Sequence, residues 1–551
     1  MEARSRDLLL AEPSRQRLDQ VRAELSTAFT VTGADRPTRR ARRIWLDTFD
    51  WRLYRAGLTL QQVTDRNATE LVLTTQDGTQ ITAVIDRTTR TRTPGPRTPG
   101  TRTPGWPARI EALPDGPLKD RLAKIIANRA LLAVATATGQ TSELRLLNPD
   151  QKTVARLHID TFTRPGTRPG TRPGRDPLPA RLSVSEVRGY QPAARRARHL
   201  LAATPGIATS RQTPLEAALE AAGRHALDYS GKVDLKLRPA MPGREAVSAL
   251  LLQQLDTLEA NVDGVLHDTD TEFLHDLRVA VRRTRSALKL LGDQLPGELT
   301  LRFASEFRWL GDITTPLRDL DVQLEELPSR AAGLVAAQPA DLEPFRVYLT
   351  RRRTAARRAL NRGLRSDRFA TVLGDWRKAL LVPRANRRSP ASPRTADLAA
   401  ARTRRAYNKV IRMGAAITDD SPAESLHTLR KRCKELRYVL EFFASLHDPQ
   451  AQQAMVGDLK RVQDCLGEFQ DSEVQQHEIQ SLAAAMLARQ AAPAPALLAM
   501  GELAGQLGLR QRQARAEFAG RFAAFAGSAG RRRLDALNSA PRTAAPAWTR
   551  A

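Results

Sequence analysis

Two fourteen-residue stretches of the chain carry histidine and arginine at the same spacing. Residues 272–285 read EFLHDLRVAVRRTR, and residues 424–437 read ESLHTLRKRCKELR. Both have a helical pattern, and like charges one turn apart on a helix repel each other. Arginine guanidinium groups bind phosphate oxygens through paired, charge-assisted hydrogen bonds, so a polyanion would remove this repulsion. The two stretches are therefore candidate anion-binding helices.

The two stretches belong to an internal repeat with a constant offset. His275 and His427 are 152 residues apart, and the same offset relates Asp312 to Asp464 in the next predicted helix. The register continues from each histidine for about fifty residues without a gap. This spacing predicts a duplicated helical unit, with two similar bundles packed about a pseudo-two-fold axis.

On a helical wheel the basic residues of each copy share one stripe. With about 100° per residue, this stripe lies beside the apolar stripe of the same helix, and Arg283 falls outside it. A solvated face would lie opposite the core and mix both signs, so we expect the basic stripe to line a groove or pore between the bundles. Its members are His275, Arg278, Arg282, Arg285 and Lys289 in the first copy, and His427, Arg430, Lys434 and Arg437 in the second.

Acidic residues on the following helix leave two alternatives open. Asp312, Asp319 and Asp321 could pair with the arginines inside the bundle, which would make the stripe structural. They could also form a metal site, but their spacing suits helix ends and ion pairs better. No histidine or cysteine has the spacing of metal ligands, so we expect no metal.

Composition indicates the kind of partner. The 551-residue chain has a net charge of +27, which favours a polyanion: nucleic acid, an anionic membrane or polyphosphate. Aromatic residues make up 5%, too few for the stacking platforms of single-strand binders, which disfavours nucleic acid. The cysteines, Cys433 and Cys465, fall at apolar helical positions and predict reduced core residues and a cytoplasmic location. No apolar run is long enough for a membrane span.

The pattern of the chain predicts a multidomain α+β protein. Residues 1–205 contain short β-branched runs with turn signals, such as residues 76–79 and 148–150, which predict an antiparallel β-barrel-like domain. Basic Pro/Gly-rich insertions at 91–105 and 163–175 are expected to be flexible loops. We expect a linker over 206–243, an all-α domain over 244–527 and a flexible tail over 528–551.

The helical region resembles the CHAD domain, the conserved-histidine α-helical domain. The resemblance covers residues 244–527 and rests on LHDLRVAVRRTRSALKLL with FRWLGDITTPLRDLDV, and on LHTLRKRCKELRYVLEFF with LKRVQDCLGEFQDSEV. It implies two pseudo-symmetric helical bundles that bind inorganic polyphosphate in a basic groove or pore, and association with polyphosphate granules. It assigns this binding to the nine stripe residues and also to Arg308, Lys460, Arg353 and Arg357.

The N-terminal region resembles the CYTH domain, the triphosphate-tunnel barrel. The resemblance rests on IWLDTFDWRLYRAGLTL, a central hairpin and LSVSEVRGY. It implies Mg²⁺- or Mn²⁺-dependent triphosphate chemistry, but the Glu-x-Glu-x-Lys strand of the family corresponds here to Glu2-Ala3-Arg4-Ser5-Arg6, and the late acidic strand keeps only Glu186. We therefore expect a degenerate barrel without catalytic residues. The alternatives are a residual metal-dependent tri- or polyphosphate hydrolase and, less favoured, a nucleic-acid-binding protein.

Overall fold

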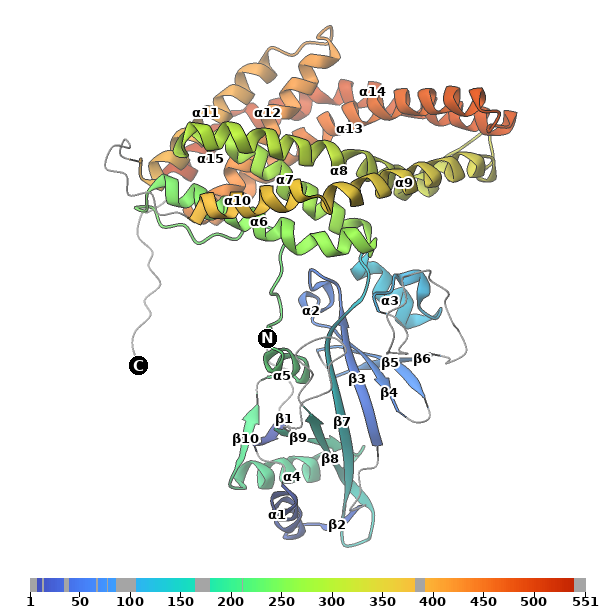
Figure 1. The fold of residues 1–551 in the computed structure, drawn as a ribbon. Coiled ribbons are helices and arrows are strands. Elements are labelled where there is room, and N and C mark those ends of the chain that lie inside the picture. Colours follow the sequence, from blue (N-terminus) through green and yellow to red (C-terminus); the bar gives the residue numbers. More distant parts are fainter. Residues whose placement is uncertain are drawn as a thin grey trace. The chain divides into compact units, whose positions relative to one another are not determined.

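The computed structural model describes residues 7–11, 14–33, 39–65, 68–76, 78–85, 106–163, 179–210, 212–381 and 392–539. Contacts between residues divide the chain into two compact units, Met1–Ser230 and Gly231–Ala551. The first contains an antiparallel sheet and the second contains helices (Figure 1). The predicted multidomain α+β class is therefore confirmed. The insertion at 91–105, residues 164–175 of the second insertion, and residues 2–6 lie outside the described residues.

The first unit is built on one ten-stranded antiparallel sheet. Its strand order is β10-β1-β9-β8-β7-β3-β4-β5-β6, and β2 pairs with the far part of β7. Among the described strands no pair joins β6 to β10, so hydrogen bonds do not close the expected barrel. The strands are β1 (Asp7–Leu10), β2 (Thr30–Gly33), β3 (Arg39–Asp47), β4 (Thr59–Thr64), β5 (Thr69–Thr74), β6 (Gln80–Ile85), β7 (Leu132–Leu147), β8 (Thr153–Thr163), β9 (Ala180–Glu186) and β10 (Ile207–Ser210).

The predicted hairpins are present. β5 pairs with β6 across a turn in which Gly78 has φ +87°, a conformation that favours glycine. β7 pairs with β8, with Leu147 opposite Thr153. Helices α1 and α4 pack on the leucine-rich face of β1, β8 and β9, and α2 and α3 pack on β3 to β5. The helices are α1 (Arg15–Ser26), α2 (Arg52–Arg55), η1 (Ile110–Ala112), α3 (Pro117–Ile126), α4 (Gln191–Ala203) and α5 (Pro214–Ala221).

The prediction of a linker from residue 206 was wrong at its start. β10 pairs with β1 at the sheet edge, and α5 begins with a capping box formed by Thr213 and Glu216. Leu215 and Leu219 of α5 are buried with Trp45 and Trp51. These segments are too short for periodicity to reveal them, and burial against the sheet stabilises them. The chain between α5 and α6 has no helix or strand.

The second unit repeats one set of helices. α11, α12, η4 and α13 each begin 152 residues after α6, α7, η2 and α8, which confirms the predicted duplication. The first copy contains α6 (Gly243–His267), α7 (Thr271–Leu291), η2 (Gly292–Gln294), α8 (Gly297–Ala331), η3 (Pro339–Leu342), α9 (Glu343–Leu364) and α10 (Asp367–Leu381). The second contains α11 (Thr395–Ala415), α12 (Ala423–Phe442), η4 (Ala444–Leu446), α13 (Pro449–Ala488), α14 (Ala494–Ala526) and α15 (Ser528–Ser539).

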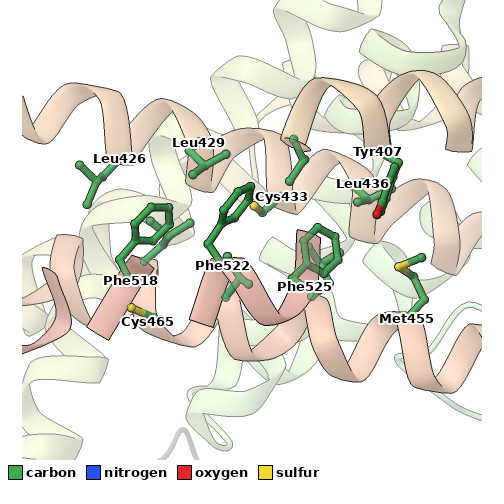
Figure 2. Packing of buried hydrophobic residues seen from close by; sticks show 14 of the residues in the cluster. Tyr407, Leu426, Leu429, Cys433, Leu436, Met455, Cys465, Phe518, Phe522 and Phe525 are labelled. Carbon is green, nitrogen blue, oxygen red and sulfur yellow. The ribbon is translucent and has the colours of Figure 1, made fainter. Parts of the chain in front are cut away.

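The core of the second copy shows how the apolar stripe of α12 is used. Leu429 and Cys433 of α12 are fully buried, and Phe518 and Phe522 of α14 point toward them (Figure 2). Gly414 makes room for this packing, because a Cβ there would lie 2.0 Å from the Phe522 ring. Both cysteines are free and buried, as predicted. Burial raises the pKa of the Cys433 thiol to about 12, so this thiol stays protonated.

The segment predicted as a flexible tail begins with a helix. Leu534 and Leu537 of α15 are buried in the core of the second copy. The guanidinium of Arg533 forms an ion pair with Asp458, a carboxylate of α13 that also accepts a hydrogen bond from Arg461. This amphipathic helix of 12 residues was missed because its two leucines are surrounded by arginine and small residues. Residues 540–551 lie outside the described residues.

Candidate anion-binding site

The first basic stripe is positioned by the start and the apolar face of α7. Asp270 caps this helix by accepting hydrogen bonds from the backbone N–H groups of Glu272 and Phe273, at 3.0 and 3.2 Å. Leu277 and Val281 are buried in the bundle, so the adjacent stripe lies at the edge of the core. Its inner members are partly buried and its outer members are exposed. The partly buried ones are His275 and Arg278, and the exposed ones are Arg282, Arg285 and Lys289.

The two stripes meet where α7 contacts α12. The Nε of Arg282 donates a hydrogen bond to the hydroxyl of Tyr438, and the Nζ of Lys289 lies 2.7 Å from a carboxylate oxygen of Glu435. The stripe of α12 (His427, Arg430, Lys434 and Arg437) is partly buried along its whole length. Two residues of the first stripe therefore contact the helix that carries the second stripe.

One ion pair occurs at the same place in both copies. Arg278 donates to the Thr314 carbonyl oxygen at 3.1 Å, and its Nη1 lies 3.7 Å from Asp319. The equivalent Arg430 donates to Asp471 at 3.0 Å. Asp319 and Asp471 are 53% and 57% exposed, and such solvated pairs contribute little to stability. Two arginines of the stripes thus pair with acidic residues of the following helix, which was the structural alternative. Because these pairs are weak, we keep both arginines in the candidate site.

Other cations at or beside the stripes have no partner within the described residues. In that part of the chain, Arg285, Lys434 and His275 make no hydrogen bond or ion pair. The same holds for Arg308 on α8 and Lys460 on α13, both exposed. The Nδ1 of His427 is buried and also lacks a hydrogen-bond partner. Lys434 is the partly buried cation of this group, and the absence of a hydrogen bond or ion pair to it among the described residues favours an anion beside it.

The electrostatics of the site follow from this arrangement. Burial and the charges of Arg430 and Arg282 lower the pKa of the Lys434 ammonium to about 8, although Asp471 opposes the shift. Arg282 belongs to the other copy, so its effect on Lys434 places both stripes in one electropositive region. Burial and the charge of Arg318 lower the pKa of His275 below its usual value. His275 therefore takes up a proton only at a lower pH than the 6.5 of a free side chain.

Arg353 and Arg357 of α9 do not belong to this site. Arg353 donates to Asp268 at 3.0 and 2.6 Å and to Asp321 at 2.6 Å. The Nε of Arg357 lies 3.6 Å from Asp268, and its Nη2 donates to the Leu266 carbonyl oxygen at 3.3 Å. Both arginines therefore satisfy groups at the C-terminal end of α6. The helical wheel of α9 alone could not reveal these partners, and we leave both residues out of the site.

Two further arginines complete the description. Arg283 lies outside the stripe as predicted, since it donates to the Gly231 carbonyl oxygen at 2.6 Å and pairs with Glu441 at 3.3 Å. Arg318 of α8 was missed, although its charge affects both His275 and Arg278. The repeat gave no signal for it, because the residue 152 positions later is Gln470.

In the first unit, two acidic residues of the CYTH-like segments make structural contacts. Glu186 of β9 forms an ion pair with Arg198 at 3.0 Å. Asp47 accepts hydrogen bonds from the backbone of Leu53 and Tyr54, and burial raises its pKa to about 6. In the described parts of the chain, no group of three or more His, Cys, Asp or Glu side chains could hold a metal ion.

Comparisons with known proteins identify the helical region. The family model described as the CHAD domain matches residues 249–480. The uncharacterized protein Rv2226 of Mycobacterium tuberculosis is 33% identical over 256 residues, which cover 45% of this chain and 47% of that protein. This chain therefore spans about half the length of the curated relatives it matches.

Solved structures give two further similarities. The crystal structure of the CHAD domain from the plant Ricinus communis is matched with 28% identity and a TM-score of 0.44, over 52% of this chain and 94% of that one. PptA from Streptomyces chartreusis is matched with 19% identity and a TM-score of 0.39, over 51% of this chain and 99% of that one. None of the helices in the described residues is long and apolar enough to cross a membrane.

Proposed function

We propose that the CHAD domain at residues 249–480 of this chain binds inorganic polyphosphate between its two basic stripes. The observation that supports this most is the convergence of equivalent cationic stripes on the contact between α7 and α12. Several of these cations have no partner among the described residues, and Arg285 and Lys434 are the clearest examples.

The shape of the site favours a polymer of phosphates over a single phosphate. Lys289 lies fourteen positions after His275, which corresponds to about 21 Å along α7. Successive phosphates of one chain would contact successive side chains of a stripe, and each contact would be charge-assisted. A flexible, unbranched polyanion can follow the stripe and enter between the copies more readily than a stiff duplex can. We therefore place polyphosphate ahead of nucleic acid as the partner.

The CYTH-like first unit contributes no catalysis in this proposal. Glu186, the one acid kept in the late strand, is engaged with Arg198, and Asp47 is engaged with backbone N–H groups. Divalent metal is needed to neutralise and align a triphosphate for attack, and its usual ligands are carboxylates. Release of phosphate from tripolyphosphate with Mg²⁺ or Mn²⁺, abolished by Glu186→Ala, would contradict this part of the proposal.

An equilibrium titration of the full chain tests the function. Long-chain polyphosphate should bind saturably, and the affinity should fall as salt rises because counterions screen the phosphates. Duplex DNA at the same phosphate concentration should fail to displace it. Absence of saturable polyphosphate binding, or displacement by DNA, would contradict the proposal and in the second case favour a nucleic-acid-binding function.

A further inference from the structure

Arg318 breaks the chemical symmetry of the repeat. It lies on α8 directly before Asp319, and the equivalent position of the second copy is Gln470, directly before Asp471. Gln470 has a clear local role, because its side-chain oxygen accepts a hydrogen bond from Arg430 at 3.1 Å. The two halves of the site therefore share one ion pair but differ by one positive charge beside it.

The guanidinium of Arg318 is poorly satisfied by the protein. Its side chain is 15% exposed, and its Nη1 is buried without a hydrogen-bond partner. Its closest carboxylate oxygen belongs to Glu325 and lies 3.8 Å away, beyond hydrogen-bonding distance. Glu325 also accepts a hydrogen bond from the hydroxyl of Thr271, so it is shared between two partners. A guanidinium in this state is costly, and an anion with several oxygens would satisfy it.

The surroundings of Arg318 place it at the basic stripe of α7. The Thr314 carbonyl, one helical turn before Arg318, accepts the hydrogen bond from Arg278. The positive charge of Arg318 lowers the pKa of His275 and that of Arg278, in each case as a smaller cause than burial. Asp319 is the one acid beside this cluster that pairs with Arg278, and it is about half exposed. Asp321 and Glu325 also lie near Arg318, and beside the shared ion pair the first copy has a positive charge where the second has Gln470.

We propose that Arg318 is a further polyphosphate-binding residue and that it makes the first copy's half of the site bind phosphate more strongly than the second copy's half. The proposal rests on the function proposed above. The guanidinium of Arg318 would donate to a phosphate oxygen that also contacts Arg278 or His275. At the equivalent place in the second copy, Gln470 supplies no charge and directs its oxygen to Arg430 instead.

The repeat supplies the variants that test this. Arg318→Gln gives the first copy the chemistry of the second, and a glutamine at the equivalent helical position is already tolerated by the fold. Gln470→Arg makes the reciprocal change. Arg318→Lys keeps the positive charge but loses the planar guanidinium, which can donate two parallel hydrogen bonds. Arg358→Gln is the matched control, because Arg358 is exposed on α9 and has no partner among the described residues.

The measurement is the affinity of each full-length variant for long-chain polyphosphate at fixed salt, with helix content followed by circular dichroism. Arg318→Gln should weaken binding about tenfold, Arg318→Lys less, and Gln470→Arg should strengthen it. If the wild type binds but Arg318→Gln and Arg358→Gln weaken binding equally, Arg318 is not a ligand. If Gln470→Arg brings no gain, this position does not set the difference between the halves. If the wild type itself does not bind, the proposed function fails instead.

Discussion

The Nε of Arg282 on α7 donates a hydrogen bond to the hydroxyl of Tyr438 on α12, and so links the two copies of the repeat beside both basic stripes. Tyr438 lies 152 residues after Ser286, and among the described residues no hydrogen bond joins Ser286 to Lys434, the equivalent of Arg282. The contact is therefore one-sided, although the helices that carry it are equivalent. It holds Arg282 close enough to Lys434 for its charge to lower the pKa of that ammonium group.

The pKa of Lys434 predicts a pH dependence of binding. A pKa of about 8 means that Lys434 is largely charged at pH 7, half charged near pH 8 and largely neutral at pH 9. A bound polyanion would raise this pKa, so binding at pH 8–9 should be accompanied by proton uptake. We expect polyphosphate affinity to fall as pH rises from 7 to about 9.5.

Lys434→Arg is the matched variant for this prediction, since arginine is the residue at the equivalent position, Arg282. Arginine stays charged over this range, so the fall in affinity should become shallower. The charged groups that act on Lys434 are Arg430 and Arg282, which lower its pKa, and Asp471, which opposes the shift. Identical pH profiles for wild type and variant would contradict the assignment.

Arg353 should be needed for folding, and not for binding. It forms ion pairs with Asp268 and with the buried Asp321, both at 2.6 Å. Arg353→Gln would leave the Asp321 carboxylate unpaired, which should lower the free energy of unfolding by about 3 kcal/mol. Urea unfolding of the full chain followed by circular dichroism measures this. The control is Arg351→Gln, which changes an exposed arginine of the same helix; equal unfolding midpoints would show that the network stabilises nothing.

Helix α15 should stabilise the second copy. Leu534 and Leu537 are 5% and 3% exposed in its core, so Leu534→Ala or Leu537→Ala should each lower the free energy of unfolding by about 2–3 kcal/mol. Leu509→Ala changes a leucine of α14 that is 61% exposed, and it should change stability by less than about 0.5 kcal/mol. If all three variants unfold alike, α15 does not dock as described.

The sequence was sufficient for features that depend on local pattern. The offset of 152 between His275 and His427 reproduces the starts of four pairs of helical elements. The apolar stripes of the two helices also predicted correctly which side of each helix faces the core. The strands and hairpins of the first unit followed from β-branched runs and turn residues in the same way.

The sequence was insufficient where the partner of a side chain lies on another element. Arg353 has the same position on the helical wheel of α9 whether it faces a groove or Asp268. Only the packing of α9 against other helices determines which of the two its side chain contacts. Arg318 was missed for the same reason, because its place beside His275 and Arg278 depends on how α8 packs against α7. Short elements such as α5 and β10 depend on burial against the sheet, which periodicity over a few residues does not show.

The central claim is that polyphosphate binds at the two stripes, beyond a general attraction to a chain of charge +27. The most direct measurement compares two double variants of the full chain in a titration with long-chain polyphosphate at fixed salt. Arg285→Gln with Lys434→Gln removes two unpartnered cations of the stripes, and Arg358→Gln with Arg362→Gln removes two exposed arginines of α9. We predict that the first pair weakens binding at least about tenfold and the second by much less. Equal losses from both pairs would contradict the account.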